Sequence, residues 1–257
     1  MDKNVGVFFL CALFVASVPL VGSTYGAFEP QAAVLMQALH RLGVPSANLE
    51  SEAVRFDRDP ALPAEGYAIA VSDSGVQALA SDSVGAAHAA ADLVRRAGID
   101  GERVTWAPGE WADAPDFAYR SFLVDMGRNP HSPETLRHVV DMMWFYRGNY
   151  LQLHLTDDQL FSWPSEVYPE LYSERAGWTK EAFRELEAYS QARGVTIVPE
   201  LEVPGHSSIL RQRRPDVFGE TPLELATTPK AQEGVEALIA EILDVFQATP
   251  YMHIGAD

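Results

Sequence analysis

Cysteine is almost absent from this chain of 257 residues, since the only one is Cys11, inside an apolar run near the start. If that run is removed on export, the mature chain has no thiol, no disulfide and no cysteine metal site. The length suffices for one large domain or two ordinary ones.

Basic residues are also scarce, with 19 Lys and Arg against 36 Asp and Glu, so the formal net charge is −17. This balance argues against nucleic acid or an anionic membrane as a partner, because both require positive charge on the protein. It fits a protein that acts on neutral or cationic ligands.

Long hydrophobic runs are missing except at the start, where Lys3 precedes an apolar run from Val5 to Val21. Pro19 interrupts the run, which is short for a membrane span of roughly 20 residues. We predict a signal peptide at residues 1–27, with cleavage between about Ser23 and Ala27, and a secreted or periplasmic protein. An uncleaved membrane anchor is the alternative.

The next segment is predicted to form a small α/β domain at residues 28–110. A helical period covers 33–43, "AVRFDRD" and "YAIAVS" alternate like strands, and Ser72–Gly75 forms a hairpin turn. An Ala-rich helix follows, with Ser83 as its expected N-cap. The Pro- and Trp-rich stretch 106–117 is predicted to be a linker.

From Tyr119 onward, four apolar strands alternate with three helices. The helices have expected N-caps at Ser132, Thr179 and Thr228, and Pro133 is suited to a first helical position. Strict alternation of strands and helices predicts a parallel sheet.

Both an open doubly wound sheet and a (β/α)8 barrel fit this alternation. No Gly-rich phosphate loop follows a strand, and polar residues follow each strand at its C-terminal end, where barrel enzymes keep their active sites. These residues are Asp125, Arg128, Asp157, Asp158, Glu200, Glu202, His206, His253 and Asp257. We therefore predict an α/β fold in which the small N-terminal domain precedes the first half, about four βα units, of a truncated TIM (β/α)8 barrel at residues 118–257.

Four motifs end the predicted strands: "VDMGRN", "LHLTDDQLF", "PELEVPGHS" and "HIGAD". In that order they resemble the strand-end motifs of glycoside hydrolase family 20, the β-N-acetylhexosaminidases. The resemblance covers about Tyr119 to Asp257, and the preceding α/β segment looks like the small domain that comes before the barrel in that family.

The resemblance implies hydrolysis of oligosaccharides or glycoconjugates with a terminal β-linked N-acetylhexosamine, without a cofactor. In this family the 2-acetamido oxygen of the substrate attacks the anomeric carbon, so the enzyme supplies no nucleophile. Asp257 matches the carboxylate that orients the acetamide, and a Glu expected directly after it matches the general acid. The sequence stops before that Glu, so a fragment of a longer, active protein is expected, and a naturally short protein is the alternative.

The remaining family matches concern the sugar and the general acid. Arg128 matches the arginine that binds the sugar 3- and 4-hydroxyls, although Asn129 stands where the family usually has His. Asp157 matches the carboxylate that pairs with the histidine equivalent to His206, a couple that tunes the acid. Asp158 is the second member of the acidic pair.

Other positions are less specific. Glu202 stands where the family commonly has Asp, and His253 is expected to support its strand end rather than touch the sugar. Trp163, in the loop after the second strand, is either a sugar-stacking platform or core, whereas Trp144 is expected in the core.

Two other function classes remain open. A catalytically inactive carbohydrate-binding relative would keep Arg128 and Asp257 but lack the acid. An unrelated barrel hydrolase would use Asp157 and Asp158 as metal ligands. The sequence shows no histidine at metal spacing from this pair, so no metal is predicted.

Overall fold

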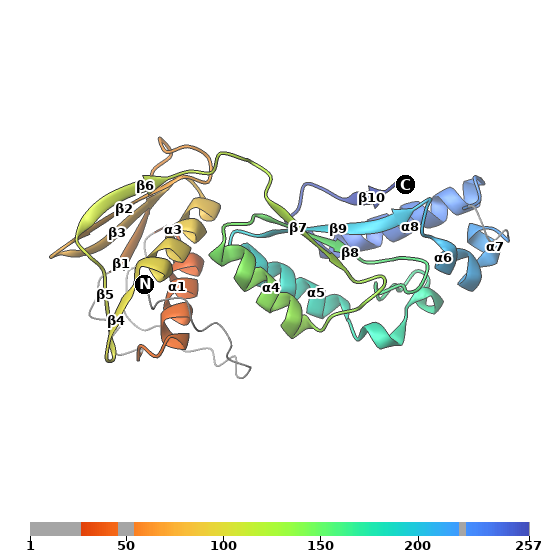
Figure 1. Cartoon of the computed structure of the whole chain (residues 1–257). Coiled ribbons are helices and arrows are strands. Elements are labelled where there is room, and N and C mark those ends of the chain that lie inside the picture. The colour runs from red at the N-terminus through yellow and green to blue at the C-terminus, as the bar shows by residue number, and fades with distance from the viewer. Residues whose placement is uncertain (1–26, 46–53, 221–224, 257) are drawn as a thin grey trace, which may run out of the picture.

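A computed structural model describes residues 27–45, 54–220 and 225–256. Residues 1–26 of the predicted signal peptide therefore lie outside the described residues, and so does Asp257. Figure 1 shows two separate sheets, one in the N-terminal part of the chain and one in the C-terminal part. None of the helices within the described ranges has the length and apolar character that a membrane crossing needs.

The N-terminal sheet has four strands in the order β1-β3-β2-β6, with two helices against one face (Figure 1). Strand β1 runs parallel to β3, and β2 pairs antiparallel with both β3 and β6. The elements are α1 (Glu29–Arg41), β1 (Val54–Arg58), β2 (Tyr67–Ser72), β3 (Gly75–Ala80), α3 (Ser83–Arg96) and β6 (Gly109–Asp113), with a two-stranded ribbon of β4 (Gly98–Asp100) and β5 (Arg103–Thr105). The predicted hairpin turn at Ser72–Gly75 is confirmed.

Two sequence predictions are wrong in this domain. The predicted linker 106–117 contains strand β6, so the sheet extends to Asp113. This strand lies at the sheet edge with mostly exposed side chains, so its sequence lacks the apolar alternation of a buried strand. The N-cap of α3 is Asp82 rather than Ser83, because its carboxylate accepts a hydrogen bond from the Gly85 N–H at 2.9 Å.

The C-terminal sheet has the order β10-β9-β8-β7, and every pair of neighbours is parallel, as predicted. Ser132, Thr179 and Thr228 cap the three long helices, as predicted, whereas the short α6 and α7 were not expected. The elements are β7 (Ser121–Asp125), α4 (Pro133–Phe145), β8 (Tyr150–His154), the 3-10 turns Pro169–Leu171 and Glu174–Ala176, α5 (Lys180–Gln191), β9 (Thr196–Val203), α6 (Ser208–Arg213), α7 (Pro215–Phe218), α8 (Pro229–Val245) and β10 (His253–Gly255).

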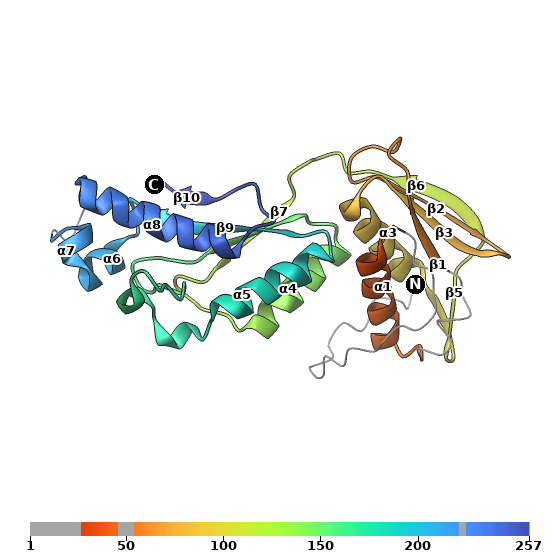
Figure 2. The same ribbon diagram turned by 180° about the vertical axis from the view of Figure 1, so that it is seen from behind.

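The two faces of this sheet differ. Helices α4, α5 and α8 lie on one face, as Figures 1 and 2 show from opposite sides. The strand register pairs Asp125 with His154 and His154 with Glu200, so these three side chains form one row on the other face. On that open face Leu123 and Tyr251 remain half-exposed, since no element of the described chain packs over them.

The two domains are joined by packing of α3 against α4. The indole N–H of Trp144 in α4 donates to the Ala87 carbonyl of α3 at 2.8 Å, and its side chain is buried. The prediction that Trp144 belongs to the core is therefore confirmed.

Candidate active site

The loop after β7 carries a guanidinium that is shared between two carboxylates. Arg128 contacts Asp125 Oδ2 through Nη1 at 2.7 Å and Asp157 Oδ2 through Nη2 at 2.5 Å. The Arg128 side chain remains 45% exposed, so it can reach a ligand. Gly127 allows the loop after β7 to pass close to the loop after β8, because a Cβ there would lie 2.7 Å from the Thr156 carbonyl carbon and 2.8 Å from Asp157 Cβ.

The loop after β8 carries the acidic pair, and its two members differ in environment. Asp157 is fully buried, with Oδ1 accepting the Asp158 N–H at 2.6 Å. Asp158 is only partly buried, and its Oδ1 accepts the Ser208 N–H at the start of α6 at 2.9 Å. Hydrogen bonds from Ser208 lower the pKa of Asp158 below its usual value of 3.8. Both carboxylates are thus held in place by backbone donors.

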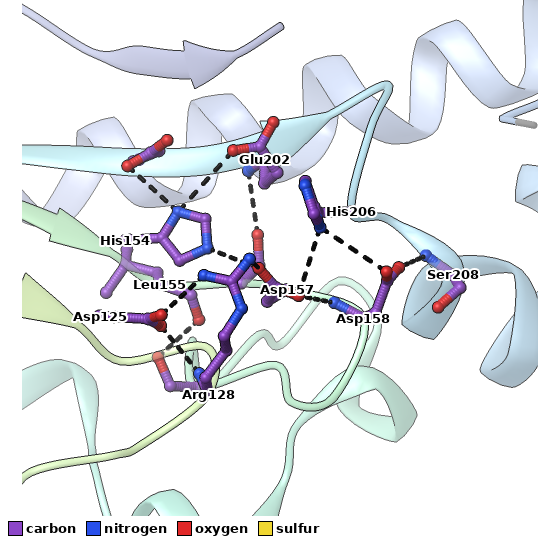
Figure 3. A network of polar contacts seen from close by, with 12 residues as sticks. Asp125, Arg128, His154, Leu155, Asp157, Asp158, Glu202, His206 and Ser208 are labelled. Atoms are coloured by element: carbon purple, nitrogen blue, oxygen red, sulfur yellow. Dashed lines mark hydrogen bonds and ion pairs between the residues drawn. The ribbon is translucent and has the colours of Figure 1, made fainter. Parts of the chain in front are cut away.

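The loop after β9 brings His206 over the acidic pair. Its Nδ1 lies 3.6 Å from Asp157 Oδ1 and 3.7 Å from Asp158 Oδ2 (Figure 3). His206 has a φ of 43°, an uncommon conformation for a residue other than glycine. Arg128, Asp157, Asp158 and His206, which come from three loops, therefore meet at one end of the sheet.

Beneath these loops lies a buried layer of charged residues that the sequence analysis only partly identified. His154, the last residue of β8, was not singled out as a site residue. Its Nε2 contacts Asp157 Oδ2 at 3.0 Å, and its Nδ1 lies 3.2 Å from Glu200 Oε2 and 3.7 Å from Glu202 Oε2. Figure 3 shows the ring between the acidic loop and β9.

The electrostatics of this layer couple His154 to Glu200. Burial by itself lowers the pKa of His154, but hydrogen bonds to Glu200 and Asp157 outweigh it and raise this pKa to about 9. Burial likewise raises the pKa of Glu200, but hydrogen bonds from His154 and Gln152 outweigh it and lower this pKa to about 2. The pair is therefore an imidazolium and a carboxylate at neutral pH.

Two further predicted residues join this layer. Glu202 is buried, and its backbone N–H donates to Thr156 Oγ1 at 3.0 Å. Its carboxylate occupies the space beside β10, because a Cβ on Gly255 would lie 1.8 Å from Glu202 Oε1. His253 contacts Glu200 Oε1 through Nδ1 at 3.0 Å, so it supports its strand end.

Trp163 is not available as a sugar-stacking platform, and this part of the sequence prediction is wrong. Its side chain is fully buried, with ring centroids 5.4 Å from Phe183 and 6.2 Å from Phe246. The indole N–H donates to Glu241 Oε2 of α8 at 2.9 Å. Packing against α5 and α8 covers both the ring and its polar group, so Trp163 is a core residue.

Among the residues that the structure describes, two sets of three bring ligand atoms within 4.8 Å of one another: His154 with Glu200 and Glu202, and Asp157 with Asp158 and His206. In space His206 thus accompanies the acidic pair, although it lies some 50 positions away in sequence. In the first set both ring nitrogens of His154 already contact carboxylate oxygens. In the second set Asp157 already has a cationic partner, Arg128. That no metal is used stays a prediction.

The residues that form this cluster all fall within one matched segment. Residues 117–257 match the family model of the catalytic domain of glycosyl hydrolase family 20. The chain belongs to this family.

Relatives and solved structures agree with the family-20 assignment. A β-hexosaminidase of Vibrio furnissii is 27% identical over 235 residues, which cover 77% of this chain and 38% of that protein. A β-hexosaminidase of Emericella nidulans is 32% identical over 201 residues, which cover 67% of this chain and 33% of that protein. The chain thus spans less than half the length of these two relatives.

The structure of the family-20 exo-β-N-acetylglucosaminidase of Vibrio harveyi in complex with N-acetylglucosamine superimposes with a TM-score of 0.78 at 25% identity. The match covers 90% of this chain and 42% of that protein. The family-20 β-N-acetylhexosaminidase of Streptomyces coelicolor has a TM-score of 0.73 at 21% identity, covering 88% of this chain and 52% of that one. This second likeness concerns the fold alone.

Proposed function

We propose that the protein to which this chain belongs is an exo-acting β-N-acetylhexosaminidase. It removes terminal β-linked N-acetylglucosamine or N-acetylgalactosamine from oligosaccharides or glycoconjugates. The observation that carries the proposal is the meeting of Arg128, Asp157 and His206 at the C-terminal ends of β7, β8 and β9, inside the segment that matches the family. This end of parallel strands is where barrel enzymes place catalytic groups.

The proposed reaction uses the substrate's own acetamide as the nucleophile. The acetamido oxygen forms a bond to the anomeric carbon while the bond to the leaving oxygen breaks. A carboxyl group, expected directly after Asp257, gives its proton to the leaving oxygen. Water then opens the oxazolinium intermediate with retention, and the same carboxylate takes up the proton.

The described residues have supporting roles in this proposal. Arg128 binds the 3- and 4-hydroxyls through its planar fork, for which its exposed guanidinium is suited. The Asp157–His206 pair sets the protonation behaviour of the acid, and Asp158 holds the His206 loop through Ser208. Strand β10, held beside β9 by the His253–Glu200 contact, leads to Asp257, which orients the acetamide.

The proposal also covers residues 1–257 in isolation, which we expect to have no measurable hydrolysis. Strands β7 and β10 are the two edges of the C-terminal sheet, and the open face leaves Leu123 and Tyr251 half-exposed. Unpaired edges and apolar faces favour association. We therefore expect this segment to need the rest of a (β/α)8 barrel, and turnover by purified residues 1–257 would contradict this.

We also propose that the protein is exported, because the segment 1–27 has the composition of a signal peptide. N-terminal sequencing of the expressed protein is expected to start between about residues 24 and 28. A cytoplasmic protein that still begins at Met1 would overturn this part.

A catalytically inactive carbohydrate-binding relative is the second candidate, and it would keep Arg128 and Asp257 for binding but lack the acid. The residue that follows Asp257 in the full-length gene distinguishes the two. A Glu there supports the enzyme, and any other residue supports the binder.

The decisive experiment is Asp257→Asn in the full-length protein. The amide keeps the shape but removes the charge that opposes the developing cation, so kcat on an aryl β-N-acetylglucosaminide should fall about 10²- to 10³-fold. KM should change less, because the cation exists only near the transition state. A kcat within a few-fold of wild type, at an unchanged thermal melt, would refute the role of Asp257.

A further inference from the structure

The ring of His154 faces carboxylates with both of its nitrogens. Nε2 lies 3.0 Å from Asp157 Oδ2, and Nδ1 lies 3.2 Å from Glu200 Oε2. A neutral imidazole has one N–H, so one nitrogen would direct its lone pair at a carboxylate. With both carboxylates ionised, both contacts are favourable only when the ring carries two protons, so the geometry favours an imidazolium.

Charged groups from four strands or their loops surround this ring, and most are acidic. Burial opposes the charge, yet hydrogen bonds to Glu200 and Asp157 hold the pKa of His154 at about 9. The groups are Asp125 and Arg128 from the end of β7, Asp157 from the end of β8, Glu200 and Glu202 from β9, and His253 from β10.

Asp157 thus has two cationic partners that differ in accessibility. The Arg128 side chain is 45% exposed, whereas that of His154 is 8% exposed. If Arg128 turns toward a sugar, it gives up part of its contact with Asp157. A fully buried carboxylate without a cationic partner is costly, so His154 is the partner that can keep Asp157 paired and oriented throughout.

The same ring also connects β8 to β10. Glu200 Oε2 contacts His154, and Glu200 Oε1 contacts His253 Nδ1 at 3.0 Å. This chain of contacts ends on the strand that leads to Asp257. His154 thereby lies between the Asp157–His206 pair and the strand that carries the acetamide-orienting residue.

We propose that His154 is a positioning residue of this site: a buried imidazolium that holds Asp157 toward His206 while Arg128 engages the sugar. The proposal rests on the proposed hexosaminidase function. His154 does not touch the substrate, so its effect passes through Asp157.

A double-mutant cycle in the full-length protein tests this route. His154→Gln keeps one N–H donor but removes the charge, and kcat should fall about tenfold or more, with a smaller change in KM. In an Asp157→Asn background the same substitution should have almost no effect on kcat. A purely structural role predicts equal losses in both backgrounds, and that result, or a kcat within threefold of wild type, would overturn the proposal.

His88→Gln is the matched control, because His88 is a buried histidine of the N-terminal domain. It should leave kcat unchanged. Thermal melts of all variants separate loss of folded protein from loss of rate per folded molecule.

Imidazole ¹⁵N NMR tests the charge without any activity. The signal that disappears in His154→Gln should report two protonated ring nitrogens at pH 7.5, and a single protonated nitrogen would overturn the proposal. If wild type does not hydrolyse the aryl glycoside, the proposed function fails, and the NMR result still decides the state of His154.

Discussion

Two clusters of polar and charged side chains lie at opposite ends of the same strands, and they have similar members but different chemistry. At the N-terminal ends of β7 and β8, the Glu65 carboxylate forms an ion pair with Arg120 at 2.6 Å and accepts a hydrogen bond from the Asn149 side-chain amide at 2.8 Å. His88 Nδ1 contacts the Glu65 carbonyl oxygen at 3.2 Å. At the C-terminal ends, His154 contacts the carboxylates of Asp157 and Glu200 instead.

The partners of each histidine decide its charge. Burial lowers the pKa of His88 to about 4, and the Arg120 guanidinium beside it adds to this effect, so His88 is neutral. His154 is also buried, but its carboxylate neighbours keep it charged. The first cluster joins the two domains with balanced charge, whereas the second holds surplus negative charge where a ligand can bind. Barrels commonly separate stability and catalysis in this way.

The largest expected effect is an opposite pH dependence of the two histidines. The raised pKa of His154 contributes stability that is complete below its ordinary value of 6.5 and is lost as pH rises through about 9. The lowered pKa of His88 contributes stability that is complete above 6.5 and is lost as pH falls through about 4. Each full effect is on the order of 3 kcal/mol, since each unit of difference between the folded and unfolded pKa of a histidine is worth about 1.4 kcal/mol.

Urea unfolding of the full-length protein between pH 4 and 9 measures both effects. His154→Gln should flatten the curve above pH 6.5 only, and His88→Gln should flatten it below pH 6.5 only. Identical curves for the two variants would mean that the two clusters do not differ as described.

The next effect concerns the junction cluster. Glu65→Ala leaves Arg120 and Asn149 without their shared carboxylate, and the free energy of unfolding should fall by about 2 kcal/mol. The rate per folded molecule should not change, because this cluster lies at the far end of the strands. Glu110→Ala, an exposed position on β6, is the control and should be nearly neutral. A large loss of kcat in Glu65→Ala would show that the junction also positions the site.

The smallest effect compares two glycines in the left-handed region, Gly194 with a φ of 69° and Gly43 with a φ of 94°. Alanine at either position should cost about 1 kcal/mol of stability from backbone strain. At Gly194 a Cβ would also lie 3.0 Å from Ala87 Cβ in α3, whereas at Gly43 no atom lies within 4 Å. Chemical denaturation should therefore rank Gly194→Ala as the less stable variant. Equal losses of stability would mean that α3 moves away from the new Cβ at no cost.

Most of the strand and helix pattern was predictable because it depends on near neighbours in sequence. Ser132, Thr179 and Thr228 each bond to an N–H three residues away, so the cap is visible in any short window. The edge strand β6 was missed, because its pairing with β2 is set by residues some 40 positions away rather than by its own composition.

The candidate site was predictable in its membership but not in its contacts. Parallel strands bring their C-terminal ends to the same end of the sheet, so Asp125, Asp157 and Glu200 had to lie close together. The choice between platform and core for Trp163 could not be made from the sequence, because Phe183 of α5 and Phe246 at the end of α8 cover its ring. His154 was missed because a histidine in an apolar strand has no sequence signal until Glu200 lies beside it.

By itself the sequence determined most of the strand and helix alternation, the caps at Ser132, Thr179 and Thr228, and the residues that end each strand of the C-terminal sheet, because these depend on side-chain period and local hydrogen bonding. Only the tertiary structure decided which of those side chains are buried, which histidine is charged and which is neutral, and that Glu202 fills the space over Gly255. Burial and charge are set by groups that meet across strands and loops, and no short segment of the chain contains both partners.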